Sequence, residues 1–200
     1  MIDIVTTGTL VSSGWVDDDY GLAGNISWDF RFYGTVYHDI YVSENGTAFF
    51  WDDDTGYFGG DPIPDSYSPD AFIAPFWTDL NIAGNGAVFF QDFGDHFVLM
   101  WREIDYWGDG VYTFELICWE APDSSTDSNF AFLYAFTPYD NYYAIGMQGD
   151  ATTGTELANQ PDPADFVVSD DWYLLTPDST YFDDYAIEET TWGQIKAGIE

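Results

Sequence analysis

Basic side chains are almost missing from this sequence. Among its 200 residues only Arg31, Arg102 and Lys196 are basic, against 36 Asp and Glu, so the formal net charge is −33. Binding to nucleic acid needs basic residues that neutralise phosphates, so no nucleic-acid partner is expected. An anionic membrane surface is disfavoured for the same reason. Repulsion among the carboxylates opposes a compact state, and salt or bound cations weaken it.

Cysteine, long apolar runs and catalytic motifs are scarce as well. The single cysteine, Cys118, excludes an internal disulfide framework, and its place on one strand face with Phe114 and Leu116 predicts a buried structural thiol. No apolar run is long enough to cross a bilayer, so we expect no membrane insertion. Residues 1–7 lack the features of a signal peptide. No nucleophile elbow, Walker loop, dinucleotide fingerprint or zinc-ligand cluster occurs, so we expect a protein that is not an enzyme.

Aromatic and apolar residues are abundant instead. They make up 20% and 46% of the chain, which argues against intrinsic disorder. Aromatic and β-branched residues suit the pleated surface of a sheet, whereas strong helix formers are sparse here. Short apolar runs alternate with turn residues and have no helical segments between them, a pattern typical of a sandwich or barrel. The sequence predicts an all-β antiparallel β-sandwich with a short irregular or helical C-terminal tail.

The strand patterns indicate how such a sandwich is built. They occur at residues 28–33, 36–43, 47–51, 87–92, 96–104, 111–119, 129–137 and 142–148, with an apolar, buried segment at 71–76. Asn45-Gly46 between two of these runs predicts a hairpin turn. Segment 96–104 is apolar on both faces, which predicts a central strand with Phe97, Leu99 and Trp101 on one face and Val98, Met100 and Ile104 on the other. Segments 129–137 and 142–148 are expected to form a further hairpin.

These patterns also suggest how the chain divides. We expect an N-terminal strand or arm over residues 1–14 and the sandwich over residues 15–157. Residues 158–200 form a C-terminal extension, which we expect to pack on the same domain or on a neighbouring subunit. Within it only residues 191–197 have the pattern of a short helix.

Two acidic triplets are the candidate metal ligands. They are Asp17-Asp18-Asp19 and Asp52-Asp53-Asp54, each beside glycine or aromatic turn residues. Calcium takes several carboxylate and carbonyl oxygens, but neither triplet has the spacing of an EF-hand loop. In an extended chain adjacent aspartates point to opposite faces, so one triplet alone cannot enclose an ion. The alternative is that the acidity serves solubility or a salty habitat, in which case no cofactor is required.

Aromatic residues in two loops suggest a second kind of site. Sugar-binding modules lay a flat ring against a sugar and hold its hydroxyls with carboxylates, and Trp51, Tyr57, Tyr106 and Trp107 sit beside aspartates. The alternative is that these rings fill the core or cover a neighbouring strand. Sequons at Asn25 and Asn45 are candidate glycosylation sites, although a turn explains Asn45 as well.

Several motifs occur in an order that resembles the nidogen-like (NIDO) extracellular domains. The first are residues 14–20 (Gly-Trp-Val-Asp-Asp-Asp-Tyr), 30–34 and 40–46 (Ile-Tyr-Val-Ser-Glu-Asn-Gly). Residues 73–80, with an Ala-Pro-Phe-Trp-x-Asp block, continue the pattern, followed by 86–90, 97–101, 112–116 and 144–148. The resemblance spans roughly residues 15–155 and implies an extracellular β-rich domain of the kind found in matrix and adhesion proteins. It implies no catalytic residues.

Two functional hypotheses follow. The first is a secreted structural or adhesive surface protein that self-associates, with the strand-like opening residues 1–11 completing a neighbour's sheet edge or with the C-terminal tail docking on a neighbour. The second is a carbohydrate- or calcium-dependent binding module of a cell-surface system. The expected partners are therefore copies of the same chain, other surface proteins or glycans.

Overall fold

The computed structural model describes residues 1–52, 59–66, 68, 70–82, 84–106, 110–121, 124, 126–136, 142–159, 172–175 and 177. These residues form two antiparallel β-sheets packed together, and no helix occurs among them. The predicted all-β sandwich is confirmed. The short helix predicted at residues 191–197 lies outside the described residues.

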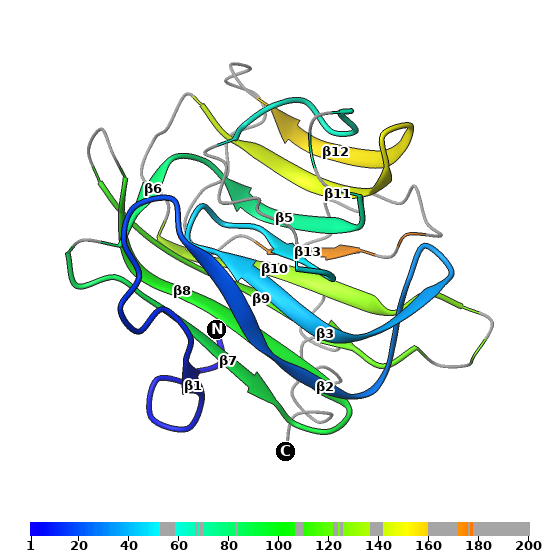
Figure 1. Cartoon of the computed structure of the whole chain (residues 1–200), viewed down its shortest axis with the longest axis horizontal. Helices are drawn as coiled ribbons and strands as arrows, with labels where there is room; N and C mark the ends of the chain where they lie inside the picture. Colours follow the sequence, from blue (N-terminus) through cyan, green and yellow to red (C-terminus); the bar gives the residue numbers. More distant parts are fainter. Residues whose placement is uncertain are drawn as a thin grey trace.

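The first sheet is formed, in spatial order, by β1 (Thr9–Leu10), β7 (Ala87–Asp92), β8 (His96–Tyr106), β9 (Val111–Trp119), β10 (Asn129–Phe136) and β13 (Trp172–Leu175), with β6 (Leu80–Asn81) pairing with β8. The second sheet is formed by β12 (Thr153–Asn159), β11 (Ala144–Asp150), β5 (Phe72–Trp77), β4 (Ala48–Phe49), β3 (Thr35–Ser43) and β2 (Tyr20–Phe32). Figure 1 shows β2 and β3 of the second sheet lying across β7, β8 and β9 of the first.

Aromatic side chains from both sheets fill the space between them. Phe30 of β2 lies 5.6 Å from Phe97 of β8, and Phe76 of β5 lies 5.8 Å from Phe114 of β9, measured between ring centroids. Tilted and edge-on contacts of this kind add to the gain from burying the rings. The buried core also includes Cys118, whose thiol pKa is raised by burial, in agreement with the predicted structural role.

The strand pattern of residues 96–104 is confirmed in its main feature and wrong in one detail. Residues 96–101 are all buried, and β8 pairs on both sides, so the strand is central. Ile104, however, packs in the inter-sheet core together with Trp101. The pairing with β9 shifts register between these two residues, and Glu103 adopts a φ of 50°. Such a bulge reverses the alternation of faces that follows it.

The hairpin predicted for residues 129–137 and 142–148 is wrong. β10 pairs with β9 and β13 in the first sheet, whereas β11 pairs with β5 and β12 in the second. The connection therefore crosses between the layers. Alternating apolar residues mark both segments as strands, but they do not state which neighbour each strand pairs with.

The hairpin predicted at Asn45-Gly46 is confirmed, with a loop one residue longer than that pair. β3 pairs with β4, and the Ser43 N–H donates to the Thr47 carbonyl at 3.0 Å, which leaves residues 44–46 as the loop. Gly46 has a φ of 81°, and a Cβ there would lie 1.9 Å from the Phe76 carbonyl oxygen. Only glycine fits this position.

A buried tryptophan connects this hairpin to the opposite sheet. The Trp101 indole N–H of β8 donates to the Ser43 carbonyl oxygen at 2.9 Å. The indole is fully buried and stacks on Phe114, with 4.9 Å between ring centroids. This hydrogen bond therefore fixes the end of β3 against β8, the central strand of the first sheet.

Residues 1–12, here called the N-terminal arm, begin on the outer face of the first sheet and then join its edge, where β1 pairs with β7 and Val11 packs against the inter-sheet core. Ile4 is fully buried in a cluster with Phe89, Val98 and Met100, which point away from the inter-sheet core. Leu10 of β1 pairs with Phe89 of β7. In Figure 1 the start of the chain lies beside β7. Only Thr9–Leu10 of the arm forms a strand.

Candidate functional site

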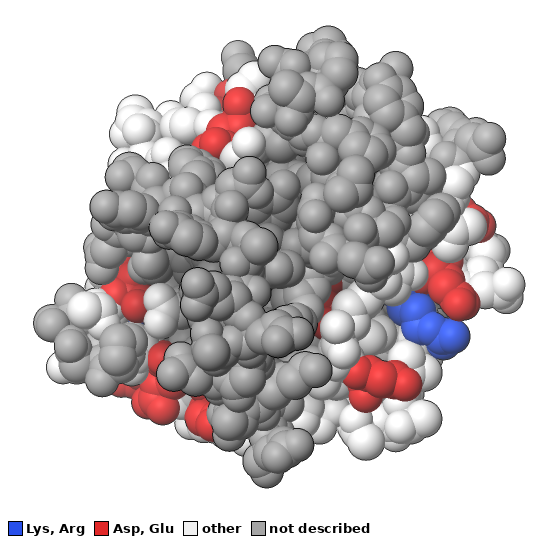
Figure 2. Space-filling model, turned by 180° about the vertical axis from the view of Figure 1, so that it is seen from behind, with Lys and Arg blue, Asp and Glu red and all other residues white. Residues whose placement is uncertain are grey.

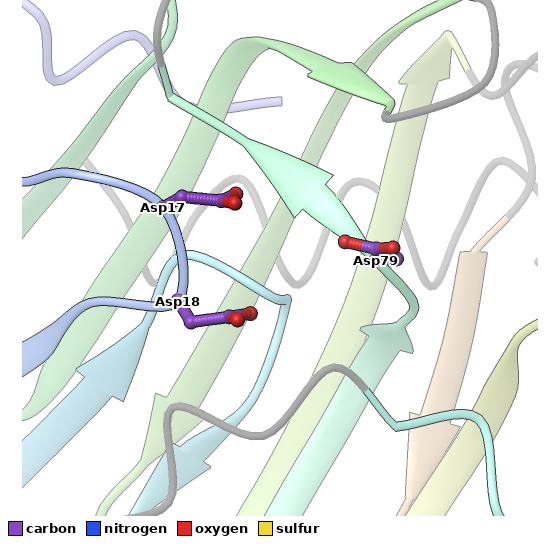
Figure 3. Close-up of side chains that lie close together, drawn as sticks. All are labelled: Asp17, Asp18 and Asp79. Atoms are coloured by element: carbon purple, nitrogen blue, oxygen red, sulfur yellow. The ribbon is translucent and has the colours of Figure 1, made fainter.

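The most distinctive polar feature is a tight turn at residues 16–19, directly before β2. The Val16 N–H donates to Asp19 Oδ2 at 2.6 Å, and the Asp19 N–H donates to the Val16 carbonyl at 3.2 Å. Asp18 adopts a φ of 60°, a conformation in which aspartate is more readily tolerated than most residues. In this turn the side chains of Asp17 and Asp18 point to the same side, not to opposite faces as the extended-chain argument predicted (Figure 3).

The turn is held by Glu44, the first residue of the β3–β4 loop. Glu44 Oε1 accepts a hydrogen bond from the Asp18 N–H at 2.6 Å, and the Glu44 N–H donates to the Asp19 carbonyl at 3.1 Å. Glu44 is 0% exposed, and its Oε2 has no hydrogen-bond partner in the described part of the chain. Burial raises the pKa of Glu44 to about 8; repulsion from Asp17 and Asp18 adds to the rise, and the backbone amides of Asp18 and Ile82 oppose it.

A third aspartate joins the turn from a distant part of the sequence. Asp79, between β5 and β6, extends toward Asp17 and Asp18, and one oxygen of each of the three carboxylates lies within 4.8 Å of the others. Figure 3 shows the three side chains converging from these two segments. We call Asp17, Asp18, Asp79 and Glu44 the acidic cluster.

Two asparagines orient the carboxylates of this cluster. Asn45 Nδ2 donates to Asp18 Oδ1 at 2.9 Å, while its Oδ1 accepts the Leu80 N–H at 2.7 Å. Asn81 Nδ2 donates to Asp17 Oδ1 at 2.6 Å. The amide groups therefore hold the turn, the β3–β4 loop and β6 together and leave carboxylate oxygens directed at one another.

None of the ion pairs among the described residues involves the cluster. The ion pairs that join two described residues are His38–Asp29, His96–Asp95 and Arg102–Glu103, and all three lie outside the cluster. Like charges this close raise the free energy of the folded state unless a cation or a proton offsets them. A group of converging carboxylate oxygens has the chemistry that hard divalent cations require.

The predicted metal ligands are thus only partly brought together. Asp17 and Asp18 belong to the cluster, whereas Asp19 points back to its own turn. Asp52 is exposed and lies 3.5 Å from the Tyr20 hydroxyl. Asp53 and Asp54 lie outside the described residues. Sequence reasoning missed Glu44 and Asp79, although both belong to the motif blocks that carry the family resemblance.

The predicted sugar-binding aromatics show packing contacts where they are described. Trp51 is partly buried against the core, 6.3 Å from the Tyr37 ring, and Tyr106 lies 5.9 Å from the Tyr112 ring. These contacts are the ones expected if the rings cover neighbouring strands. Tyr57 and Trp107 lie outside the described residues.

The two sequons occupy very different environments. Asn25 is exposed, and its side-chain amide donates to Asp39. Asn45 is 0% exposed, and both ends of its amide are used in the acidic cluster. The folded domain therefore has room for a glycan on Asn25 but none on Asn45.

Glu115 of β9 is a second buried acid, and it lies under the N-terminal arm. It is 0% exposed, and its Oε2 accepts the Ile2 N–H at 2.9 Å, while Oε1 has no partner in the described part of the chain. Burial raises the pKa of Glu115 to about 7, against the hydrogen bond from Ile2, which lowers it. The stability of the domain therefore depends on the protonation of this carboxyl.

The fold and the cluster together define a two-sheet β-sandwich domain whose surface site is built from carboxylates. The chain belongs to the NIDO-related family, whose model matches residues 2–164. This match confirms the predicted resemblance and extends it toward both ends. No curated protein and no solved structure matches the chain.

The family match bears on where such domains act. NIDO-type domains are typically extracellular. In the described part of the chain, no helix has the length and apolar character needed to span a bilayer.

Proposed function

We propose that this domain is a non-enzymatic structural or adhesive domain that acts outside the cell and associates with copies of itself by exchanging the N-terminal arm. The family match supports the extracellular setting. The observation that carries the proposal is the arm itself, which docks on the first sheet as a separate segment with Ile4 buried among Phe89, Val98 and Met100.

The contacts of the arm suit exchange between copies. Its anchors include the buried Ile4, the two-residue strand β1 and the Val88 N–H, which donates to Ser12 Oγ at 3.0 Å. Hydrogen bonds from Ile2 to Glu115 and from Thr7 to Gln91 add to them. Ile4 is the only fully buried side chain of the arm, and burying one isoleucine side chain contributes about 1.5–3 kcal/mol. A groove of about 310 Å³ lined by Val5, Met100 and Arg102 shows that its packing on the sheet is incomplete.

A hinge follows directly after these anchors. Ser13 and Gly14 are exposed, and Gly14 has a φ of 85° with no atom of the described residues within 4 Å of the position of a Cβ. Straightening this hinge would break the turn in which the Trp15 N–H donates to the Ser12 carbonyl at 3.1 Å, and it would place the arm on the same acceptor surface of a second copy with the arm–sheet contacts preserved. Such an exchange is the usual route of domain swapping, and it builds open chains when the geometry does not close.

The experiment asks where the arm of one chain docks. Thr7 Oγ1 donates to Gln91 Oε1 at 2.6 Å, and neither residue is buried, so a T7C chain and a Q91C chain are mixed and treated with a short bis-maleimide linker. A covalent pair containing one chain of each kind is expected. As the control, T7C is mixed with T152C, because Thr152 is exposed in the β11–β12 turn and does not contact the arm. Cys118 is buried and does not interfere.

A second measurement addresses assembly directly. Deletion of residues 1–12 should leave a monomer in light scattering, while the full chain forms larger species. Negative-stain images that show only monomers of the full chain at every salt and calcium concentration would refute self-association. A crosslinked product that forms equally well with T152C would refute the arm as its cause.

A further inference from the structure

We propose that the acidic cluster binds one divalent cation of the calcium class, with Asp17, Asp18 and Asp79 as its direct ligands and Glu44 Oε2 accepting a hydrogen bond from a water molecule in the cation's coordination shell. This site is independent of the proposed arm exchange, and its test does not depend on assembly.

The spacing of the carboxylates is compatible with a single calcium ion. Two ligands of one ion lie apart by at most twice the metal–oxygen distance, which is roughly 4.6–5.2 Å for calcium and about 4.0–4.2 Å for magnesium. The ligand oxygens of Asp17, Asp18 and Asp79 lie within 4.8 Å of one another, so they fit one calcium sphere as they stand.

Glu44 provides an independent observation in favour of a bound ligand, because one of its oxygens lacks a hydrogen-bond partner among the described residues. A buried polar atom almost always has a hydrogen-bond partner, yet Oε2 of the fully buried Glu44 has none among the described residues. The Ile82 amide lowers the pKa of Glu44 somewhat, but it makes no hydrogen bond of normal geometry to this oxygen. The carboxylate lies beside the cluster, because its other oxygen accepts the Asp18 N–H at 2.6 Å and because Asp17 and Asp18 are close enough to raise its pKa. In its ionised form Oε2 would accept a hydrogen bond from a water molecule held by the cation.

The site also joins segments that are distant in the sequence. Asp17 and Asp18 belong to the turn before β2, Glu44 to the β3–β4 loop, and Asp79 to the β5–β6 connection. These segments lie in three of the motif blocks that carry the family resemblance. A cation here would fix the turn that follows the hinge of the arm, and it would offset part of the acidic charge that the three basic residues cannot neutralise.

Binding is measured by calorimetric titration of calcium in 0.5 M NaCl, where salt suppresses loose binding to the acidic surface. The wild-type domain should show one saturable site with a stoichiometry of about one calcium ion per chain. The D17N/D79N variant should lose this site or bind at least tenfold more weakly. The matched control is D29N/D70N, which removes the same charge from two exposed positions away from the cluster and should bind as the wild type does.

Glu44→Gln separates a role toward the cation from a purely structural one. The glutamine side chain keeps an oxygen to accept the Asp18 N–H but lacks the charge, so the thermal midpoint of E44Q without calcium should be at least that of the wild type. Its calcium affinity should nevertheless fall several-fold. Absence of a saturable site in the wild type, or equal affinity in D17N/D79N and D29N/D70N, would overturn the proposal. Near-ultraviolet circular dichroism verifies that each variant is folded, and D79N alone replaces the double variant if that one is not.

Discussion

Replacing Glu115 by glutamine should change how stability depends on pH. The raised pKa means that the folded domain holds a proton on Glu115 at pH values where the unfolded chain has lost it. Stability therefore falls as pH rises from the unfolded value of 4.5 to the folded value of about 7, and the loss is complete above that range. At about 1.4 kcal/mol per pH unit, this interval corresponds to about 3 kcal/mol.

Glutamine keeps the acceptor for the Ile2 N–H and has no proton to lose, so E115Q should escape this penalty. Urea unfolding followed by tryptophan fluorescence at pH 4.5 and pH 8, in 1 M NaCl, gives the free energy of unfolding of each protein. The difference between E115Q and wild type should shift in favour of E115Q by about 3 kcal/mol between the two pH values. E120Q is the control, because Glu120 is exposed and directly follows the same strand. Parallel pH profiles for E115Q and the wild type would refute the reasoning.

Two further predictions concern the turn and the net charge. Gly46→Ala should destabilise the domain by several kcal/mol more than Gly94→Ala. Both glycines have a positive φ, but only a Cβ at Gly46 would meet the Phe76 carbonyl. Comparable urea midpoints for the two variants would contradict this prediction. The thermal midpoint of the wild type should rise between low and molar NaCl, because salt screens repulsion within a formal net charge of −33. A flat response in differential scanning calorimetry would show that the carboxylates are already well separated. On the face shown in Figure 2, acidic side chains appear at several separate places among the described residues, which is the distribution that such screening acts upon.

The fold could be predicted from the sequence to the extent that it depends on local pattern. The bounds of β7 and β9, the turn at Asn45-Gly46 and the burial of both faces of β8 all follow from alternation and turn residues. The partners of β10 and β11 could not be predicted in this way, because either layer of a sandwich offers the same apolar surface to a strand. The face on which Ile104 lies could not be predicted either, because a bulge in β8, just before this residue, reverses the alternation of side chains.

The candidate site shows the same division. The density of aspartate at residues 17–19 was visible in the sequence, but alternation along an extended chain gave the wrong orientation because Asp18 adopts a turn conformation. Asp79 is 61 residues from Asp18 in the chain, and no spacing rule relates them. Only the order of the family motifs hinted that these blocks belong together, and the structure shows that three of them meet.

The hydrogen bond from Trp101 to the Ser43 carbonyl makes this indole a natural optical sensor for the loop beside it. Ser43 immediately precedes Glu44, so a displacement of the loop alters the polarity and hydrogen bonding felt by a chromophore that is otherwise sealed from solvent. Events at the rim of the sandwich are thereby transmitted to its interior through a single peptide unit, and the change at Trp101 contributes to the combined emission of the nine tryptophans.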